Sequence, residues 1–180
     1  MNENYAHPEM PEGAAEGIIK GMYLLQDAGK PKKGELRVQL LGSGTILNEV
    51  IAAADLLKQD WGIEADIWSC PSFTLLARDG VATARWNLLH PTAEPRKPYV
   101  QQCLENTEGP VIASTDYVRA YAEQIRPYVP GRYQVLGTDG FGRSDTREKL
   151  RHFFEVDRYW VTTASLAALA EEEKLDPAKV

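Results

Sequence analysis

Cysteine, histidine and long apolar runs are scarce in this sequence of 180 residues. The two cysteines, Cys70 and Cys103, form no CxxC pair, and the three histidines lack HxxxH or HxxEH spacing, so no metal site is expected. Neither a GxSxG nucleophile turn nor a GxxxxGKS or GxxxxGKT phosphate loop occurs, which disfavours a serine hydrolase and a P-loop nucleotide-binding protein.

Targeting and membrane signals are also missing. No apolar run approaches the roughly 20 residues that span a bilayer. The first residues, MNENYAHPEMPEG, lack the basic start and apolar core of a signal peptide. The net charge of −6 disfavours nucleic acid and anionic membranes as partners. We therefore expect a cytoplasmic protein with reduced thiols.

What is present is an alternation of short apolar runs with segments of helical periodicity. Residues 1–11 are polar and proline-containing, which predicts an extended arm, and 12–180 predict a single domain. We expect strands at 36–44, 65–70, 110–115 and 132–137, and helices at 12–25, 45–59, 73–90, 99–108, 116–129, 145–155 and 159–173. The pattern predicts an α/β three-layer sandwich, with a mainly parallel sheet of four or five strands and helices on both faces.

Two glycines and a proline qualify this assignment. Gly80 makes one continuous helix over 73–90 doubtful, and Pro127 should end or kink the helix over 116–129. Gly62 stands where the helix over 45–59 should stop.

Glycines also follow the first expected strand. Gly42-Ser43-Gly44 opens a helix, but the third glycine of a dinucleotide fingerprint is missing. The exposed amides at this helix end could hold an anion. The simpler interpretation, which we favour, is a tight turn capped by Ser43 or Thr45.

The most distinctive stretch is VLGTDGFGRSDTREKLRHFFEVD at 135–157. Asp145 and Glu148 have capping-box spacing, so a helix should begin there. The glycines on either side of Phe141 could cradle a ligand at a strand end, together with Thr138 and Ser43. Alternatively, Phe141 and Arg143 could be interface anchors rimmed by Asp139 and Asp145.

The histidine in LRHFF belongs to the same stretch. His152 lies beside apolar residues, so we expect it to be packed or at an interface. The residues alone leave ligand binding and docking open and favour docking.

Long blocks of the sequence have a familiar order. They are LLGSGTILNEVIAAADLL, GIEADIWSCPSFTLLARDG, RWNLLHP, PVIASTDYVRAYAEQIRPYVP and VLGTDGFGRSDTREKLRHFFEVD. Together they closely resemble the C-terminal domain of the homodimeric bacterial pyruvate dehydrogenases. A shorter motif is shared with transketolase C-terminal domains, and here it is matched by Gly137, Asp139, Phe141, Gly142 and Ser144.

The resemblance implies an activity for an intact enzyme. In this family thiamine diphosphate, held with magnesium, decarboxylates pyruvate, and the acetyl unit passes to a lipoyl group on the acetyltransferase component of the complex. The cofactor lies between the first two domains and across the homodimer, and its signature is a GDG with a later NN. This chain has TDG at 138–140 and no NN, so no thiamine-binding or catalytic residue is carried over.

Two hypotheses follow. In the first, the chain is the non-catalytic third domain of a longer pyruvate dehydrogenase polypeptide, serves assembly and the dimer, and by itself is inactive and holds no cofactor. In the second, it is an autonomous small-ligand or nucleotide-binding module that uses the strand-end loops around Ser43 and Thr138.

Overall fold

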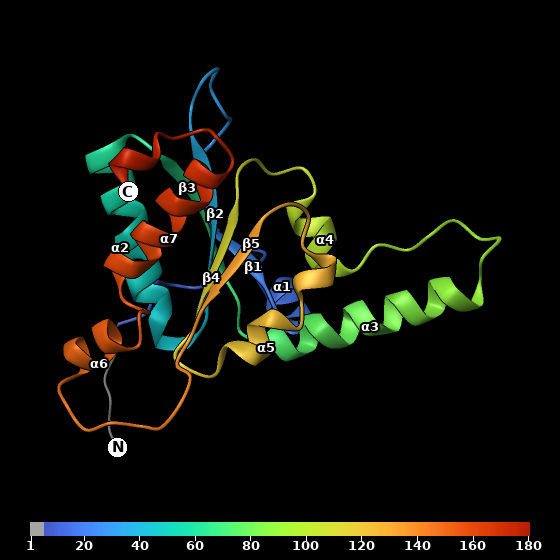
Figure 1. Ribbon diagram of the computed structural model, residues 1–180. Coiled ribbons are helices and arrows are strands. Elements are labelled where there is room, and N and C mark those ends of the chain that lie inside the picture. The colour runs from blue at the N-terminus through green and yellow to red at the C-terminus, as the bar shows by residue number, and fades with distance from the viewer. Residues whose placement is uncertain (1–5) are drawn as a thin grey trace.

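Five strands form the central sheet of the computed structural model, which describes residues 6–180 (Figure 1). The strands are β1 (Tyr23–Gln26), β2 (Arg37–Gly42), β3 (Glu64–Ser69), β4 (Val111–Ser114) and β5 (Tyr133–Leu136), in the order β1-β3-β2-β4-β5. All neighbouring strands are parallel except β1, which is antiparallel to β3. The predicted α/β sandwich with a mainly parallel sheet is confirmed.

Helices cover both faces of the sheet (Figure 1). On one face lie α2 (Leu47–Leu56) and α7 (Arg158–Glu171), with α6 (Arg147–Phe153) beside them; on the other lie α1 (Ala15–Lys20), α3 (Phe73–Leu89), α4 (Tyr99–Leu104) and α5 (Arg119–Glu123). Short 3-10 or π turns complete the chain at Gly44–Ile46, Leu57–Trp61, Arg126–Tyr128 and Pro177–Lys179.

Alternation along the strands divides the interior into two cores. Leu40 packs with the α2 and α7 side chains, whereas Leu41 packs with those of α3, α4 and α5. Successive strand residues point to opposite faces, so a strand covered on both faces is apolar at consecutive positions. Every residue of β2 is buried, as expected for a central strand of such a sheet.

The prediction of one helix over 12–25 is wrong in its second half. α1 ends at Gly21, whose φ of 109° is left-handed, and Tyr23–Gln26 continue as β1. A side chain at Gly21 would collide with the Ser72 carbonyl, 2.7 Å from the position of a Cβ. The strand arises from its pairing with β3, a long-range contact that helical periodicity does not report.

Two further predictions are corrected by Tyr128 and its neighbours. The segment 116–129 holds only the short helix α5 and the turn Arg126–Tyr128, instead of one helix. α3 is continuous through Gly80, so the doubt raised by that glycine was unfounded. A Cβ at Gly80 would lie 2.2 Å from the Tyr128 ring, so the glycine serves close packing rather than a helix break. The stop at Gly62 is confirmed by its left-handed φ of 65°.

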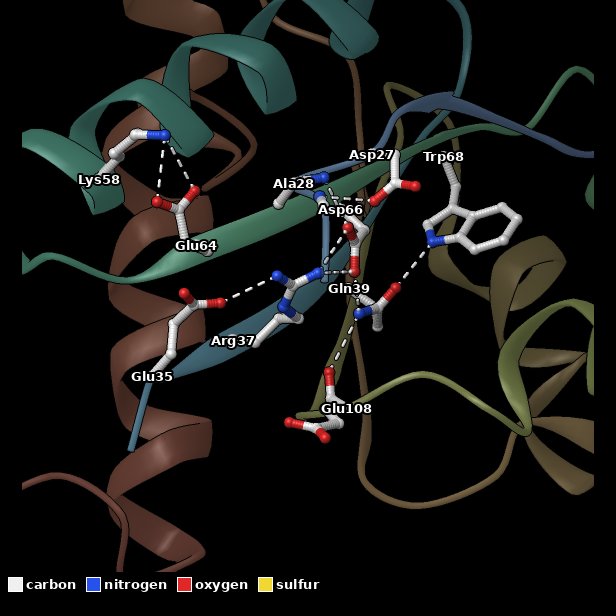
Figure 2. A network of polar contacts seen from close by, with 11 residues as sticks. Asp27, Ala28, Glu35, Arg37, Gln39, Lys58, Glu64, Asp66, Trp68 and Glu108 are labelled. Carbon is white, nitrogen blue, oxygen red and sulfur yellow. Dashed lines mark hydrogen bonds and ion pairs between the residues drawn. The ribbon is translucent and has the colours of Figure 1, made fainter. Parts of the chain in front are cut away.

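A buried polar network crosses β2 and β3 (Figure 2). Arg37 Nη1 donates to both Asp66 carboxylate oxygens at 3.1 Å, and Gln39 Nε2 donates to Asp66 at 2.7 Å. Trp68 Nε1 donates to Gln39 at 2.9 Å, and the Ala28 amide donates to Asp66 at 2.9 Å. Buried charges are tolerated when they are paired in this way, so the network fastens the polar loop before β2 to the sheet.

Candidate functional site

The candidate site lies at the carboxyl ends of the parallel strands. β3 lies beside β2 in one direction along the sheet. The chain then crosses back over β2 to form β4 on the other side of that strand, so the strand order reverses between β2 and β4. Ligands of open α/β sheets bind in the crevice outside this reversal. The residues that follow β2, β4 and β5 here include Ser43, Asp116 and Thr138.

Polar side chains at the crevice bond to one another. The Ser43 and Tyr117 hydroxyls share a hydrogen bond of 2.9 Å, and Thr45 Oγ1 donates to Asp116 Oδ2 at 3.2 Å. Thr138 Oγ1 donates to the Asp116 carbonyl oxygen. Neither Ser43 nor Thr45 caps the helix, so the predicted cap is wrong, and the two hydroxyls instead tie the loop after β2 to the loop after β4.

A hollow of about 720 Å³ opens beside these loops, between the strand ends and α6. Side chains of both charges line it, with apolar groups beneath; the lining includes Thr45, Asp116, Thr138, Arg143, Asp145 and Phe154. The structure therefore brings Thr138, Arg143 and Asp145 of the sequence-derived candidates to one hollow. Because both aspartates and arginines line it, the hollow has no single sign of charge.

The loop after β5 presents Phe141 to solvent. Phe141 is 96% exposed, and Gly140 before it has a left-handed φ of 91°. Asp139 accepts a hydrogen bond from the Arg119 amide at 3.0 Å and pairs with the Arg119 guanidinium at 3.0 Å. The Arg143 guanidinium lies 4.2 Å from the centre of the Phe153 ring. The residues near Phe141 in sequence are thus held in place while its own ring is left uncovered.

Two sequence-derived details of the next segment are wrong. α6 begins at Arg147 after Thr146, and no side chain caps it; Asp145 instead accepts a hydrogen bond from the Thr146 amide, so there is no capping box. The His152 side chain is exposed, with its Nδ1 3.0 Å from Asp157, so the packed alternative is wrong and the interface alternative stays a prediction. Asp157 contacts His152 through Oδ2 and caps α7 through Oδ1, which accepts from the Tyr159 and Trp160 amides.

A buried carboxylate that sequence reasoning missed fastens α2 to the chain around α6 and α7. Glu49 pairs with Arg151 and with Arg158 at 2.9 Å each, and it accepts the Arg158 amide at 3.1 Å. Burial by itself would raise the pKa of Glu49, but the hydrogen bonds and charges of Arg158, followed by the charge of Arg151, lower it. The sequence did offer a signal for this site, because Glu49 stands among the apolar residues of the predicted helix over 45–59.

The cysteines are free thiols: Cys70 is buried and Cys103 is partly covered. Burial raises the pKa of both thiols, which makes them poor nucleophiles.

Within 6–180, no three histidine, cysteine or acidic side chains gather where they could hold one metal ion. Over the same residues, no helix has the length and apolar character needed to cross a membrane.

Residues 21–157 match the family model of the transketolase-like C-terminal domain. The chain therefore belongs to the transketolase-like C-terminal domain family. The family resemblance seen in the sequence is confirmed.

Curated relatives of this domain are named pyruvate dehydrogenase E1 component. The one from Cupriavidus necator is 67% identical over 180 residues, which is 100% of this chain and 20% of the relative. The one from Escherichia coli K12 is 54% identical over 177 residues, covering 98% of this chain and 19% of the relative. The chain thus spans about a fifth of the length of the curated relatives it matches.

Solved structures support the fold. The transketolase from Leishmania mexicana superposes with a TM-score of 0.59 at 18% identity, covering 89% of this chain and 20% of that one. A split gene transketolase, described as an inactive beta4 tetramer, superposes with a TM-score of 0.54 at 16% identity, covering 83% of this chain and 42% of that one. At these identities the likeness concerns the architecture alone.

Proposed function

We propose that this chain is the C-terminal, non-catalytic domain of a pyruvate dehydrogenase (acetyl-transferring) and that it serves assembly and the homodimer. The observation that carries the proposal is the match over the whole chain to E1 components at 67% identity. The intact enzyme would decarboxylate pyruvate in the cytoplasm with thiamine diphosphate and magnesium and acetylate the lipoyl group of the acetyltransferase component.

The non-catalytic role is supported by how the strand-end side chains are used. Ser43, Thr45 and Thr138 all bond to groups of the neighbouring loop, which connects β4 to α5. General acid–base chemistry instead needs a titratable group directed at a substrate. We place the thiamine diphosphate and its magnesium ion in the part of the intact enzyme outside residues 1–180, because the family's GDG and NN signature is missing from this sequence.

The assembly role is supported by the loop after β5. Phe141 is almost fully exposed, and Arg143 lies against Phe153 beside it. Aromatic and arginine side chains are enriched among residues that dominate binding energy at interfaces. In this role Phe141 and Arg143 contact another domain or subunit, with Asp139 and Asp145 at the polar rim.

Dye reduction by pyruvate in the presence of thiamine diphosphate and magnesium tests this proposal. The full-length enzyme should reduce the dye, and the 180-residue chain should give no rate above a blank without protein. A rate from the 180-residue chain would refute the non-catalytic assignment. An inactive full-length enzyme that is folded and loaded with cofactor would refute the enzyme assignment.

The hollow at the strand ends favours a second candidate, a small-ligand or nucleotide-binding module. Its position at the reversal of strand order is where such folds bind ligands. Titration of the 180-residue chain with nucleotides and with thiamine diphosphate, followed by melting temperature, separates the candidates. A saturable rise would support the module, and no rise is expected for the assembly domain.

A further inference from the structure

The second half of α3 leaves the body of the domain. Figure 1 shows α3 extending beyond the sheet and a loop returning from its tip to α4. In the described chain, none of residues 81–97 is buried, although every turn of α3 before them contains a buried residue. We call residues 81–97 the α3 protrusion.

One side of the protrusion is braced by its own return loop. The Trp86 ring stacks on His90 at 4.3 Å between centroids, and the Arg96 guanidinium lies 3.6 Å from the centre of the Trp86 ring. Asn87 exchanges two hydrogen bonds with the Arg96 backbone, at 2.8 and 2.9 Å. His90 Nδ1 is 2.8 Å from the Trp86 carbonyl oxygen. The protrusion is therefore preorganised by contacts between its own residues.

The other side of the protrusion carries an aliphatic stripe. Val81, Leu88 and Leu89 are 61%, 79% and 55% exposed. They stand at positions i, i+7 and i+8, with the exposed Arg85 between them, so they share one face of the helix. Asn87 points away from this face and Trp86 lies at its edge, and both hold the return loop.

Such a stripe does not stabilise the isolated domain. Helices that lack tertiary packing are marginal below about 12–15 residues, and the projecting part of α3 is shorter than that. A prearranged aliphatic and arginine surface has instead the features of a binding site, since preorganisation lowers the entropy lost on association.

We propose that the stripe of the α3 protrusion docks onto the part of the intact enzyme polypeptide that lies outside residues 1–180. This inference rests on the proposed function and names a second contact surface, on the opposite helical layer from α6. Charge and shape complementarity to the stripe and Arg85 would require a receiving surface that is apolar and carries an acidic residue.

The size of the stripe decides between possible occupants. A stable contact between free partners buries about 800 Å² on each side, which three aliphatic side chains do not provide. A tethered partner is held at an effective concentration of about millimolar, so a small contact suffices. Because the matched relatives are about five times longer than this chain, a tethered partner is available in an enzyme of that kind.

Hydrogen–deuterium exchange tests the docking directly. Amides of residues 81–90 should exchange at least about tenfold more slowly in the full-length enzyme than in the 180-residue chain, because docking must open before exchange. Equal exchange in the two proteins would overturn the proposal. Protection that also arises in the 180-residue chain as its concentration rises would overturn it too, because the occupant would then be a second copy.

Variants give an independent result. Leu88→Asp with Leu89→Asp should abolish the protection in the full-length enzyme and leave the melting temperature of the 180-residue chain unchanged. The matched control is Tyr159→Asp, because Tyr159 is 63% exposed but lies on α7 in the other layer; it should leave the protection intact. Loss of protection in both variants, or in neither, contradicts the proposal.

Dye reduction by the same full-length enzyme separates this inference from the proposed function. An active enzyme with unprotected residues 81–90 would sink the docking alone. An inactive, folded and cofactor-loaded enzyme with protected residues would sink the enzyme assignment alone.

Discussion

The two halves of α3 differ in what their apolar side chains do. In the first half, Phe73, Leu76 and Ala77 are buried against the sheet and its neighbours. In the second half, Val81, Leu88 and Leu89 face solvent. The helix is continuous through both halves, so backbone structure does not distinguish them.

This difference shows that hydrophobic content alone does not reveal which contacts fold the domain. Burial in the first half contributes to folding, because apolar surface leaves water within the chain itself. The apolar side chains exposed in the second half would leave water only on binding a partner, so they contribute to binding and not to folding. The buried network at Arg37 and the exposed loop at Phe141 differ in the same way, because the first is buried within the domain and the second faces solvent.

The largest effect should come from the buried network. Asp66→Ala leaves the buried Arg37 paired with Glu35 alone and removes the acceptor of Gln39 and of the Ala28 amide, so it should lower the free energy of unfolding by about 3–5 kcal/mol. Urea unfolding of the 180-residue chain measures it. Glu64→Ala is the control on the same strand, since its ion pair with the exposed Lys58 should contribute less than about 1 kcal/mol. Equal losses would show that the network does not bear on folding.

Alanine should be less favourable than glycine at position 80 of α3, and more favourable than glycine at position 84. Gly80→Ala should destabilise by about 1–3 kcal/mol, because the new Cβ meets the Tyr128 ring. In the protrusion, Ala84→Gly should cost about 1 kcal/mol or less through helix propensity alone. Thermal unfolding of both variants checks this. A stabilising Gly80→Ala would show that the ring moves aside freely.

Acid should weaken the link between α2 and α7. The folded pKa of Glu49 is lowered, so the stabilisation is present above its unfolded pKa of about 4.3 and is lost as the pH falls through the folded pKa. Glu49→Gln should cost about 1–2 kcal/mol at pH 7, with a shrinking difference from the wild type below pH of about 4. Unfolding curves from pH 7 to pH 3 measure it; a pH-independent difference would contradict the assignment.

The smallest effect on folding is expected at the loop after β5. Phe141→Ala should change the stability of the 180-residue chain by less than about 0.5 kcal/mol, because the ring is uncovered. In the full-length enzyme it should weaken the dimer by about 2 kcal/mol or more, and activity should fall on dilution. Analytical ultracentrifugation of the full-length enzyme at several concentrations measures the dissociation constant of the dimer. Unaltered dissociation would reduce the loop to a plain strand-to-helix turn.

Local signals in the sequence predict the parallel part of the fold well. Apolar runs followed by glycines locate β2 and β5, because buried parallel strands are apolar on both faces. β1 escapes prediction because its pairing with β3 is a long-range contact. Gly80 was misjudged for a similar reason, since the ring of Tyr128 that requires it is distant in sequence.

The candidate site was predicted by position more than by detail. The strand-end loops around Ser43 and Thr138 both bond to the loop that follows β4, which lies between β2 and β5 in the sheet. The capping box at Asp145 failed because that aspartate bonds to the next amide, and His152 lies exposed beside Asp157 instead of being packed. The α3 protrusion carries a regular apolar periodicity, so only the structure shows that its stripe lacks a partner within the described chain.

One pair of variants tests the contrast within α3 most directly. Leu76→Ala and Leu88→Ala make the same change in one helix, at a fully buried and a 79% exposed position. In urea unfolding of the 180-residue chain, Leu76→Ala should lose about 2–5 kcal/mol and Leu88→Ala less than about 0.5 kcal/mol. A loss at Leu88 comparable to that at Leu76 would contradict the account, because the protrusion would then belong to the folding core.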